Sequence, residues 1–132
     1  MAKIKLLVDT DIIIDYLKGV KTAKEIFRSR DIDIYCSILS KKELLSKLGL
    51  KDSERIRIIK LMLRLKVLKI DENINEKYML LIKKYGRRDL IVDYLIAATA
   101  WAKNLPLLTR NRRHFEFIKE IKLSPVYEYK NE

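Results

Sequence analysis

Four polar side chains stand where apolar segments of the chain begin or end, and their chemical types suit a metal site. They are Asp9, Glu43, Asp93 and Asn111. An ionised carboxylate among apolar neighbours is unfavourable unless a cation or hydrogen bonds compensate its charge. Several acids, each at the end of a predicted element, therefore indicate convergence on one divalent-metal site.

The charge of the chain indicates what such a metal site would act on. Lys and Arg number 29 against 18 Asp and Glu, which gives a formal net charge of +11 and a sequence pI of about 9.7. This excess favours binding to polyanions and speeds encounter with them. Together with a divalent metal, it points to phosphodiester chemistry. A basic surface that is merely solvated is the alternative explanation of the same charge.

Length and composition predict one globular domain over residues 1–132. Apolar residues make up 48% of the chain and only 3 residues are Gly, which argues against a disordered tail. No apolar stretch approaches the ~18 residues that cross a bilayer, and the N-terminus lacks a signal-peptide pattern. The single cysteine, Cys36, cannot form an internal disulfide, so we expect a cytoplasmic protein. The only histidine is far from Cys36 in sequence, which argues against a catalytic thiol.

Short apolar segments alternate with helical patterns, which predicts an α/β fold with a parallel sheet covered on both faces. We expect strands over residues 5–8, 32–37, 67–70 and 107–109. The expected helices cover 10–17, a segment beginning at Thr22, 40–48, 52–65, 74–85 and 92–103. A short helix over 112–119 and an edge strand over 126–129 complete the pattern. No Gly-rich phosphate loop is present, which excludes a P-loop or dinucleotide-binding site.

The strand ends supply the geometry for the acids, because ligands of open α/β sheets bind at the carboxyl ends of the strands. Asp9 lies just past the first strand, and Thr109 and Asn111 lie just past the last. Asp93 stands at the start of the alanine-rich helix, and Glu43 lies about one turn into the helix after the second strand. We therefore expect all of them to reach one cleft. Their oxygen ligands suit Mg²⁺ or Mn²⁺.

Each of these residues also has an ordinary structural explanation. Asp9 and Asp93 can be helix N-caps, which satisfy backbone N–H groups at a helix start. Glu43 can be the far half of a capping box with Ser40. Asn111 can be a turn residue. The metal-site interpretation rests on their occurring together, in order, at the strand ends.

Nearby polar residues add to this picture. Asp11 can supplement the site, whereas Asp15, one helical turn later, is expected to face solvent. His114 beside Phe115 is expected to be a surface or packing residue rather than a base. The candidates for phosphate contacts nearest to the cleft are Arg110, Arg112 and Arg113.

Four motifs together resemble the PIN-domain nucleases, and within them the VapC-like toxins of toxin–antitoxin pairs. They are Val8-Asp9-Thr10-Asp11, Ser40-x-x-Glu43-Leu44, Asp93-x-x-Ile96-Ala97-Ala98-Thr99-Ala100, and Leu108-Thr109-Arg110-Asn111 followed by His114-Phe115. The resemblance spans nearly the whole chain, and the last two motifs are the specific ones. It implies a three-layer sandwich with a mostly parallel sheet of four to five strands.

The resemblance also implies an activity and roles for residues. The family consists of Mg²⁺- or Mn²⁺-dependent endoribonucleases that are usually homodimers and are restrained by a cognate antitoxin. By motif, Asp9, Glu43 and Asp93 form the acidic triad, and Thr109 orients a neighbouring carboxylate. Asn111 takes a fourth position where many members have an acid, and Asp11 stands where members commonly carry Asn. Both departures bear on the affinity for metal and on the number of ions bound.

Two rival functions remain open from the sequence. One is a PIN nuclease of RNA maturation or of DNA structures, and the other is a non-enzymatic, basic nucleic-acid-binding module with a degenerate site. For the antitoxin, we expect a groove beside the cleft, lined by the apolar run 12–14 and by Leu44, Leu45 and Leu48. An amphipathic helix fits such a groove.

Overall fold

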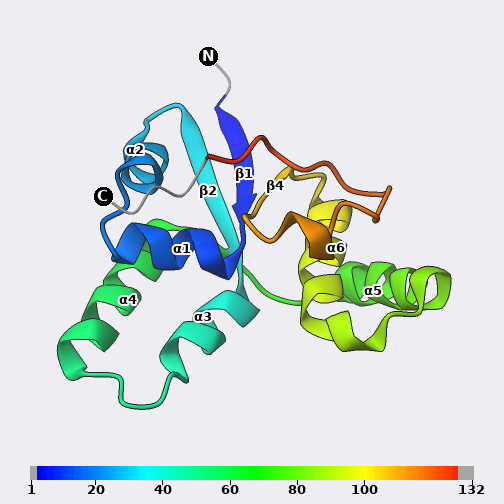
Figure 1. The fold of residues 1–132 in the computed structure, drawn as a ribbon, viewed down its shortest axis with the longest axis horizontal. Helices are drawn as coiled ribbons and strands as arrows, with labels where there is room; N and C mark the ends of the chain where they lie inside the picture. Colours follow the sequence, from blue (N-terminus) through cyan, green and yellow to red (C-terminus); the bar gives the residue numbers. More distant parts are fainter. Residues whose placement is uncertain (1–2, 128–132) are drawn as a thin grey trace.

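A computed structural model describes residues 3–127 of the chain, and its centre is a four-stranded parallel sheet (Figure 1). The strands are β1 (Ile4–Val8), β2 (Ile32–Ser37), β3 (Lys66–Leu68) and β4 (Leu107–Leu108), in the order β3-β2-β1-β4. Leu7 of β1 pairs with Tyr35 of β2 on one side and with Leu107 of β4 on the other. The order reverses between β1 and β4, so their carboxyl ends form the edge where ligands bind in such sheets.

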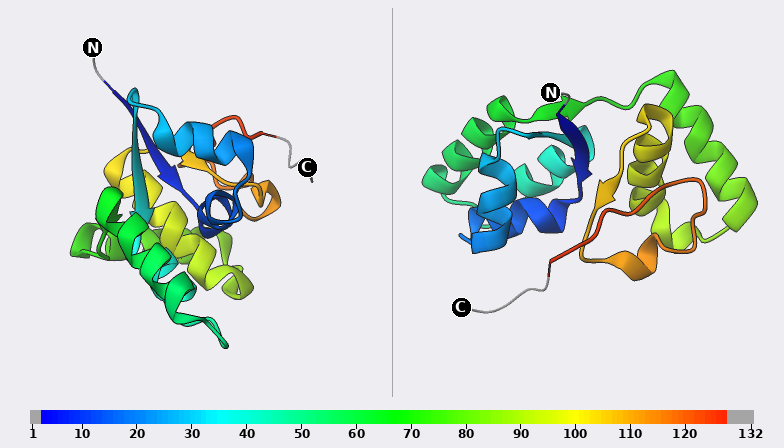
Figure 2. Two further views of the ribbon diagram at one scale, coloured as in Figure 1. Left: turned by 90° about the vertical axis from the view of Figure 1, so that its left-hand side faces the viewer. Right: turned by 90° about the horizontal axis from the view of Figure 1, so that it is seen from above.

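Helices cover both faces of the sheet, as the sequence predicted (Figure 2). One face packs against α1 (Thr10–Leu17), α2 (Lys21–Arg28), α3 (Ile38–Leu45) and α4 (Asp52–Arg64), and the other against α5 (Glu72–Tyr85) and α6 (Ile91–Lys103). The alternation along β1 produces this division, because successive side chains of a strand point to opposite faces. Leu6 and Val8 join the α1–α4 core, and Leu7 joins the α5–α6 core.

Two of the expected helix starts are wrong. The third helix is capped by Ser37, whose side chain accepts from Leu39 N, so β2 runs directly into α3. Ser40 is instead buried inside α3, where its Oγ accepts from Thr10 Oγ1 at 2.9 Å. The capping box that would have explained Glu43 is therefore absent from this helix. The second helix begins at Lys21 after Val20, without a side-chain cap, rather than being capped by Thr22.

Other boundaries moved where few contacts hold the chain. The helix expected to reach residue 48 ends at Leu45, and Leu48 is 95% exposed. Only a 3₁₀ turn, η2 (Arg112–His114), forms where we expected a helix over 112–119. A second 3₁₀ turn, η1 (Arg88–Leu90), precedes α6. The expected edge strand over 126–129 is not formed at 126–127, and its last two positions lie outside the described residues.

Candidate active site

Asp9 stands at the carboxyl end of the central strand and is fixed from two sides. It is the N-cap of α1, and its Oδ1 accepts from Thr10 N at 2.8 Å. Thr109, just past β4, donates from Oγ1 to Asp9 Oδ2 at 2.8 Å. Asp9 is only 8% exposed. The capping role and the cleft position are thus compatible in one side chain, and Thr109 is placed to orient it.

The candidate site residues from all four motifs line one cleft of about 290 Å³. Its polar lining is formed by Asp9, Thr10, Asp11, Glu43, Asp93 and Asn111, and its apolar lining by Ile14, Val92 and Ile96. Asp93 lies in the first turn of α6, whose N-cap is Leu90, so the alternative that Asp93 is an N-cap is wrong. Glu43 is exposed on α3. Four separate parts of the chain therefore contribute to the same opening.

Burial and mutual repulsion make this cleft unfavourable for ionised acids. Burial, followed by the charge of Asp11, raises the pKa of Asp9 to about 6, although hydrogen bonds from Thr109 and Thr10 oppose the change. Burial also raises the pKa of Asp11. The pKa of Asp93 is raised mainly by burial, with His114 opposing and Glu43 adding repulsion. Such perturbed carboxyls clustered in a cleft are typical of functional sites.

The donor set fits a hard divalent cation. Asp11 Oδ1 is buried without a hydrogen-bond partner among the described residues, so a cation would compensate an otherwise unsatisfied oxygen. The side chains face one opening without being drawn together. Within residues 3–127, no three Asp, Glu, His or Cys side chains are close enough to count as a ready metal-binding group. Binding a metal would require them to converge, which the repulsion between unliganded acids opposes.

His114 belongs to the edge of this cleft, contrary to the sequence expectation of a surface or packing residue. Its Nδ1 lies 3.0 Å from Asp93 Oδ2 and 2.6 Å from the Asn111 side-chain amide. One ring nitrogen cannot accept from an amide N–H while donating to a carboxylate. An Nδ1–H that donates to both Asp93 and the Asn111 amide oxygen satisfies all three groups. The spacing of three residues between Asn111 and His114 fits the 3₁₀ turn that brings them together.

Two of the arginines expected to contact RNA have other partners. Arg110 donates from Nε and Nη2 to Asp15 at 2.7 and 2.9 Å. Asp15 is only 1% exposed, so the expectation that it faces solvent is wrong. Arg112 donates from Nη1 to Ser124 O at 2.9 Å, while Arg113 is exposed. Arg113 is therefore the candidate of the three best placed to meet a phosphate.

The lone thiol takes no part in this chemistry. Cys36 is buried in β2, and burial raises the pKa of its thiol to about 12. The thiolate is the nucleophilic form of cysteine, so this side chain stays unreactive near neutral pH. The carboxylate cleft is the reactive feature that the structure describes.

The sequence and fold agree in placing this chain in one family. Residues 6–120, which include every residue of the cleft, match the PIN domain family. The chain is 32% identical over 122 residues to Ribonuclease VapC10 of Mycobacterium tuberculosis, covering 89% of this chain and 90% of that protein. The chain belongs to the PIN-domain family. A second relative of this PIN domain, Ribonuclease VapC1 of Methanocaldococcus jannaschii, is 32% identical over 123 residues, covering 90% of this chain and 85% of that protein.

Solved structures share the fold of this PIN domain. VapBC2 from Rickettsia felis, bound to a DNA fragment from its promoter, superposes with a TM-score of 0.82 at 22% identity, covering 95% of this chain and 100% of that chain. A toxin–antitoxin complex from Klebsiella pneumoniae gives a TM-score of 0.73 at 26% identity, with 88% and 94% covered. These similarities confirm the three-layer α/β fold expected from the resemblance. Among residues 3–127 of this PIN domain, no helix is long and apolar enough to cross a membrane.

Proposed function

We propose that this PIN domain, over residues 1–132, is an endoribonuclease that hydrolyses RNA phosphodiester bonds with the help of a divalent metal. The observation that carries this proposal is the cleft in which Asp9, Glu43 and Asp93 meet, in a chain of net charge +11. The relatives named ribonucleases support the same activity. The rival as a degenerate binding module does not explain why these carboxyls face one opening.

Asp9, Glu43 and Asp93 are the residues that would hold Mg²⁺ or Mn²⁺, with Asn111 assisting directly or through water. Such an ion, when bound, supplies an activated water and stabilises charge on the phosphate oxygens. The protein's part is to keep the acids in place. Thr109 fixes the Asp9 carboxylate, and His114 fixes that of Asp93. Arg113 and the wider basic surface would attract the RNA backbone.

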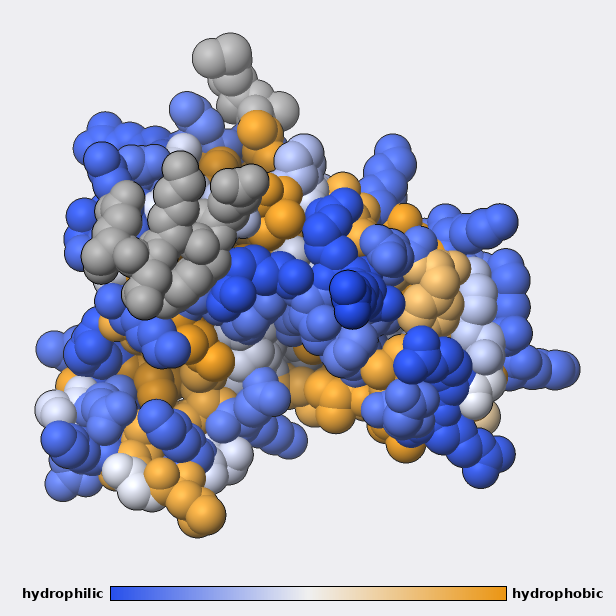
Figure 3. Space-filling view, in the orientation of Figure 1, coloured by the Kyte–Doolittle hydropathy of each residue, from blue (hydrophilic) through white to orange (hydrophobic). Residues whose placement is uncertain are grey.

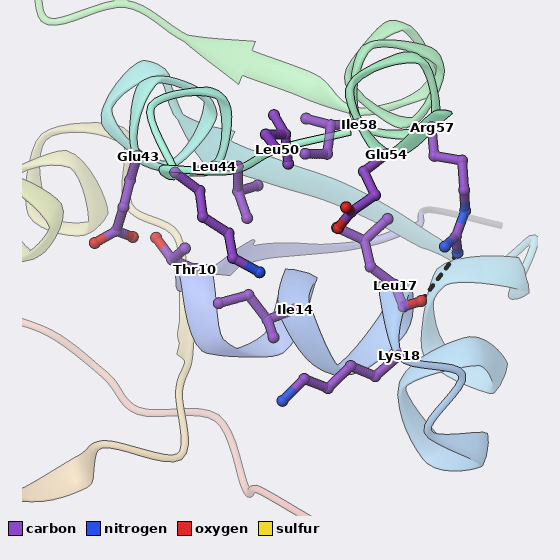
Figure 4. Close-up of a pocket in the computed structure, with 11 residues that line it drawn as sticks. Thr10, Ile14, Leu17, Lys18, Glu43, Leu44, Leu50, Glu54, Arg57 and Ile58 are labelled. Carbon is purple, nitrogen blue, oxygen red and sulfur yellow. Dashed lines mark hydrogen bonds between the residues drawn. The ribbon is translucent and has the colours of Figure 1, made fainter. Parts of the chain in front are cut away.

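We further propose that the chain is the toxin of a toxin–antitoxin pair and that its antitoxin binds an apolar groove next to the cleft. The groove has a volume of about 590 Å³ and runs between α1, α3 and α4 (Figure 4). Its apolar lining is Ile14, Leu17, Leu44, Leu50 and Ile58. Figure 3 shows hydrophobic residues gathered in this region of a largely hydrophilic face. The groove differs in part from our expectation, because Ile12 and Ile13 are fully buried in the core and Leu48 is outside its lining.

The groove leads directly into the acidic cleft. Thr10, Ile14 and Glu43 line both, and in Figure 4 Glu43 and Thr10 lie at the end of the groove opposite Arg57. An amphipathic helix seated on the apolar lining would therefore bring a following cationic side chain to the acids. That cation would compete with the metal. The solved toxin–antitoxin complexes with this fold are consistent with such a partner.

This arrangement predicts antagonism between partner and metal. Bound antitoxin should weaken Mn²⁺ binding, and Mn²⁺ should weaken antitoxin binding by the same factor. Calorimetric titration of the partner with and without Mn²⁺ measures this directly. An unchanged affinity would place inhibition elsewhere than at the cleft. Homodimer formation and a cytoplasmic location remain proposals, to be tested by light scattering and by fractionation of cells.

The test of the nuclease activity is incubation of a mixed RNA pool with the purified protein, with and without Mn²⁺, followed by mapping of the product ends. We expect cleavage that depends on the ion and gives a defined end chemistry. A parallel incubation with flap and hairpin DNA tests the rival DNA-structure nuclease. Binding without cleavage of either nucleic acid would instead support the non-enzymatic module.

A further inference from the structure

A second buried charge cluster lies behind the cleft and involves none of its proposed metal-holding residues. It consists of Asp15, Arg110 and Tyr127, here called the Asp15 cluster. Asp15 accepts two hydrogen bonds from the Arg110 guanidinium, at 2.7 and 2.9 Å, and a third from Tyr127 OH at 2.8 Å. A carboxylate this deeply buried is tolerated only with such partners. The cluster thereby joins α1, the segment after β4 and the C-terminal segment.

The segment after β4 depends on such contacts because the sheet ends before it. β4 is only Leu107–Leu108. Beyond it, Arg110 N donates to Asp11 Oδ2 at 2.9 Å, and Asn111 N donates to Thr109 Oγ1 at 3.0 Å. Side-chain acceptors, rather than a neighbouring strand, thus receive the amides of residues 110 and 111.

Arg110 occupies the centre of this segment. Its chain neighbours Thr109 and Asn111 reach Asp9 and His114, and its own amide reaches Asp11. The Arg110 side chain points the other way, to Asp15 on the second turn of α1. Asp11 and Asp15 are one helical turn apart, so they lie on the same face of α1 and hold the backbone and the side chain of Arg110 respectively.

We propose that Arg110 is a positioning residue, and that its bidentate pairing with Asp15 holds the segment carrying Thr109 and Asn111 in register with the acids of the cleft. This differs from a phosphate-binding role, for which the guanidinium would have to leave Asp15. Its consequence for catalysis rests on the proposed nuclease function. Displacing reacting groups by about 1 Å can cost on the order of a hundredfold in rate.

The two roles of Arg110 predict opposite results for Asp15→Asn. If Arg110 positions the site, this substitution lowers the single-turnover rate of RNA cleavage by about tenfold or more and leaves the Kd for RNA within about twofold. If Arg110 grips phosphate, the substitution releases the guanidinium, so RNA binding tightens and the rate does not fall. Arg110→Lys keeps the charge but loses the fork, and we expect it to resemble Asp15→Asn.

A matched control comes from a cluster of the same chemistry elsewhere. Glu120 accepts from Lys84 Nζ at 2.7 Å and from Tyr85 OH at 2.6 Å, and none of these residues lines the cleft. Glu120→Gln should therefore change the cleavage rate by less than about twofold, since it removes a comparable ion pair that does not contact the catalytic segment. An equal loss in both variants would mean that the effect of Asp15→Asn is general destabilisation, and would overturn the proposal.

Amide hydrogen exchange tests the positioning without any assay of activity. In folded Asp15→Asn, the amide of Arg110 should exchange at least about tenfold faster than in wild type, while the amide of Asp9, bonded to Leu108 O in the sheet, should be unchanged. If Asp15→Asn does not fold, Tyr127→Phe, which removes one donor, should show the same selective change at smaller size. Unaltered protection of Arg110 in the folded variant would overturn the proposal, even if the chain proves not to cut RNA.

Discussion

Replacing Asp9 by Asn removes a carboxyl group whose ionisation opposes folding, so the change should stabilise the metal-free protein above pH 6. Burial and the charge of Asp11 raise the pKa of Asp9 from 3.8 to about 6. Between these values the folded state keeps a proton that the unfolded state has released. The stabilising contribution is therefore complete below about pH 4 and is lost as the pH rises through 6.

The size of this effect follows from the pKa difference. Each pKa unit corresponds to about 1.36 kcal/mol, so the change from 3.8 to about 6 is worth about 3 kcal/mol in total. Between pH 4 and pH 7, the free energy of unfolding of wild type should fall relative to that of Asp9→Asn by about 2 kcal/mol. Asp9 is 8% exposed, so solvent screening removes little of this difference.

The assay is urea unfolding of both proteins at pH 4, 5, 6 and 7 without divalent ions. A matched control is Asp71→Asn, because the hydrogen bond from Lys103 lowers the pKa of Asp71 and its contribution is lost as pH falls. The wild-type-minus-variant difference should thus slope in opposite directions for the two substitutions. A difference for Asp9→Asn that stays constant from pH 4 to pH 7 would refute the reasoning.

Three further outcomes follow from the cleft and its surroundings. Mn²⁺ should raise the Tm of wild type more than that of an Asp9→Ala, Asp93→Ala double variant, and an equal rise would place the ion elsewhere. Neutralising Arg112 and Arg113 together should lower the salt dependence of RNA binding, by about one per lost phosphate contact in the log–log slope; an unchanged slope would mean solvated charges. Leu50→Asp, in the apolar groove, should weaken antitoxin binding at least about tenfold in calorimetry while cleavage persists, and unaltered binding would reject this groove.

Local patterns in the sequence predicted the elements that local interactions determine. β2 spans Ile32–Ser37, as expected from its apolar run. α5 ends where Gly86 adopts the left-handed conformation that favours glycine at a helix end. The start of α3 was not predictable in this way, because Ser37 ends a strand and caps the next helix at once, while Ser40 offered a competing capping pattern.

The cleft was predictable for a different reason than its supports. The acids follow strand ends, and the topology of a parallel sheet brings those ends to one edge. Asp15 was misassigned because its partner Arg110 is 95 residues away, and a single sequence holds no signal for such a pair. The contact between His114 and Asn111 was within reach, since they are three residues apart in a segment able to form a 3₁₀ turn.

The most direct test of the account is the RNA cleavage rate of Asp93→Asn compared with wild type, with Mn²⁺ present and both proteins folded by circular dichroism. The substitution preserves the shape of the side chain and removes one charge from the cleft that Asp9, Glu43 and Asp93 line. We predict a fall in the single-turnover rate of at least about a hundredfold, with RNA binding retained. A folded Asp93→Asn protein that cuts RNA as fast as wild type would contradict the assignment of this cleft as the active site.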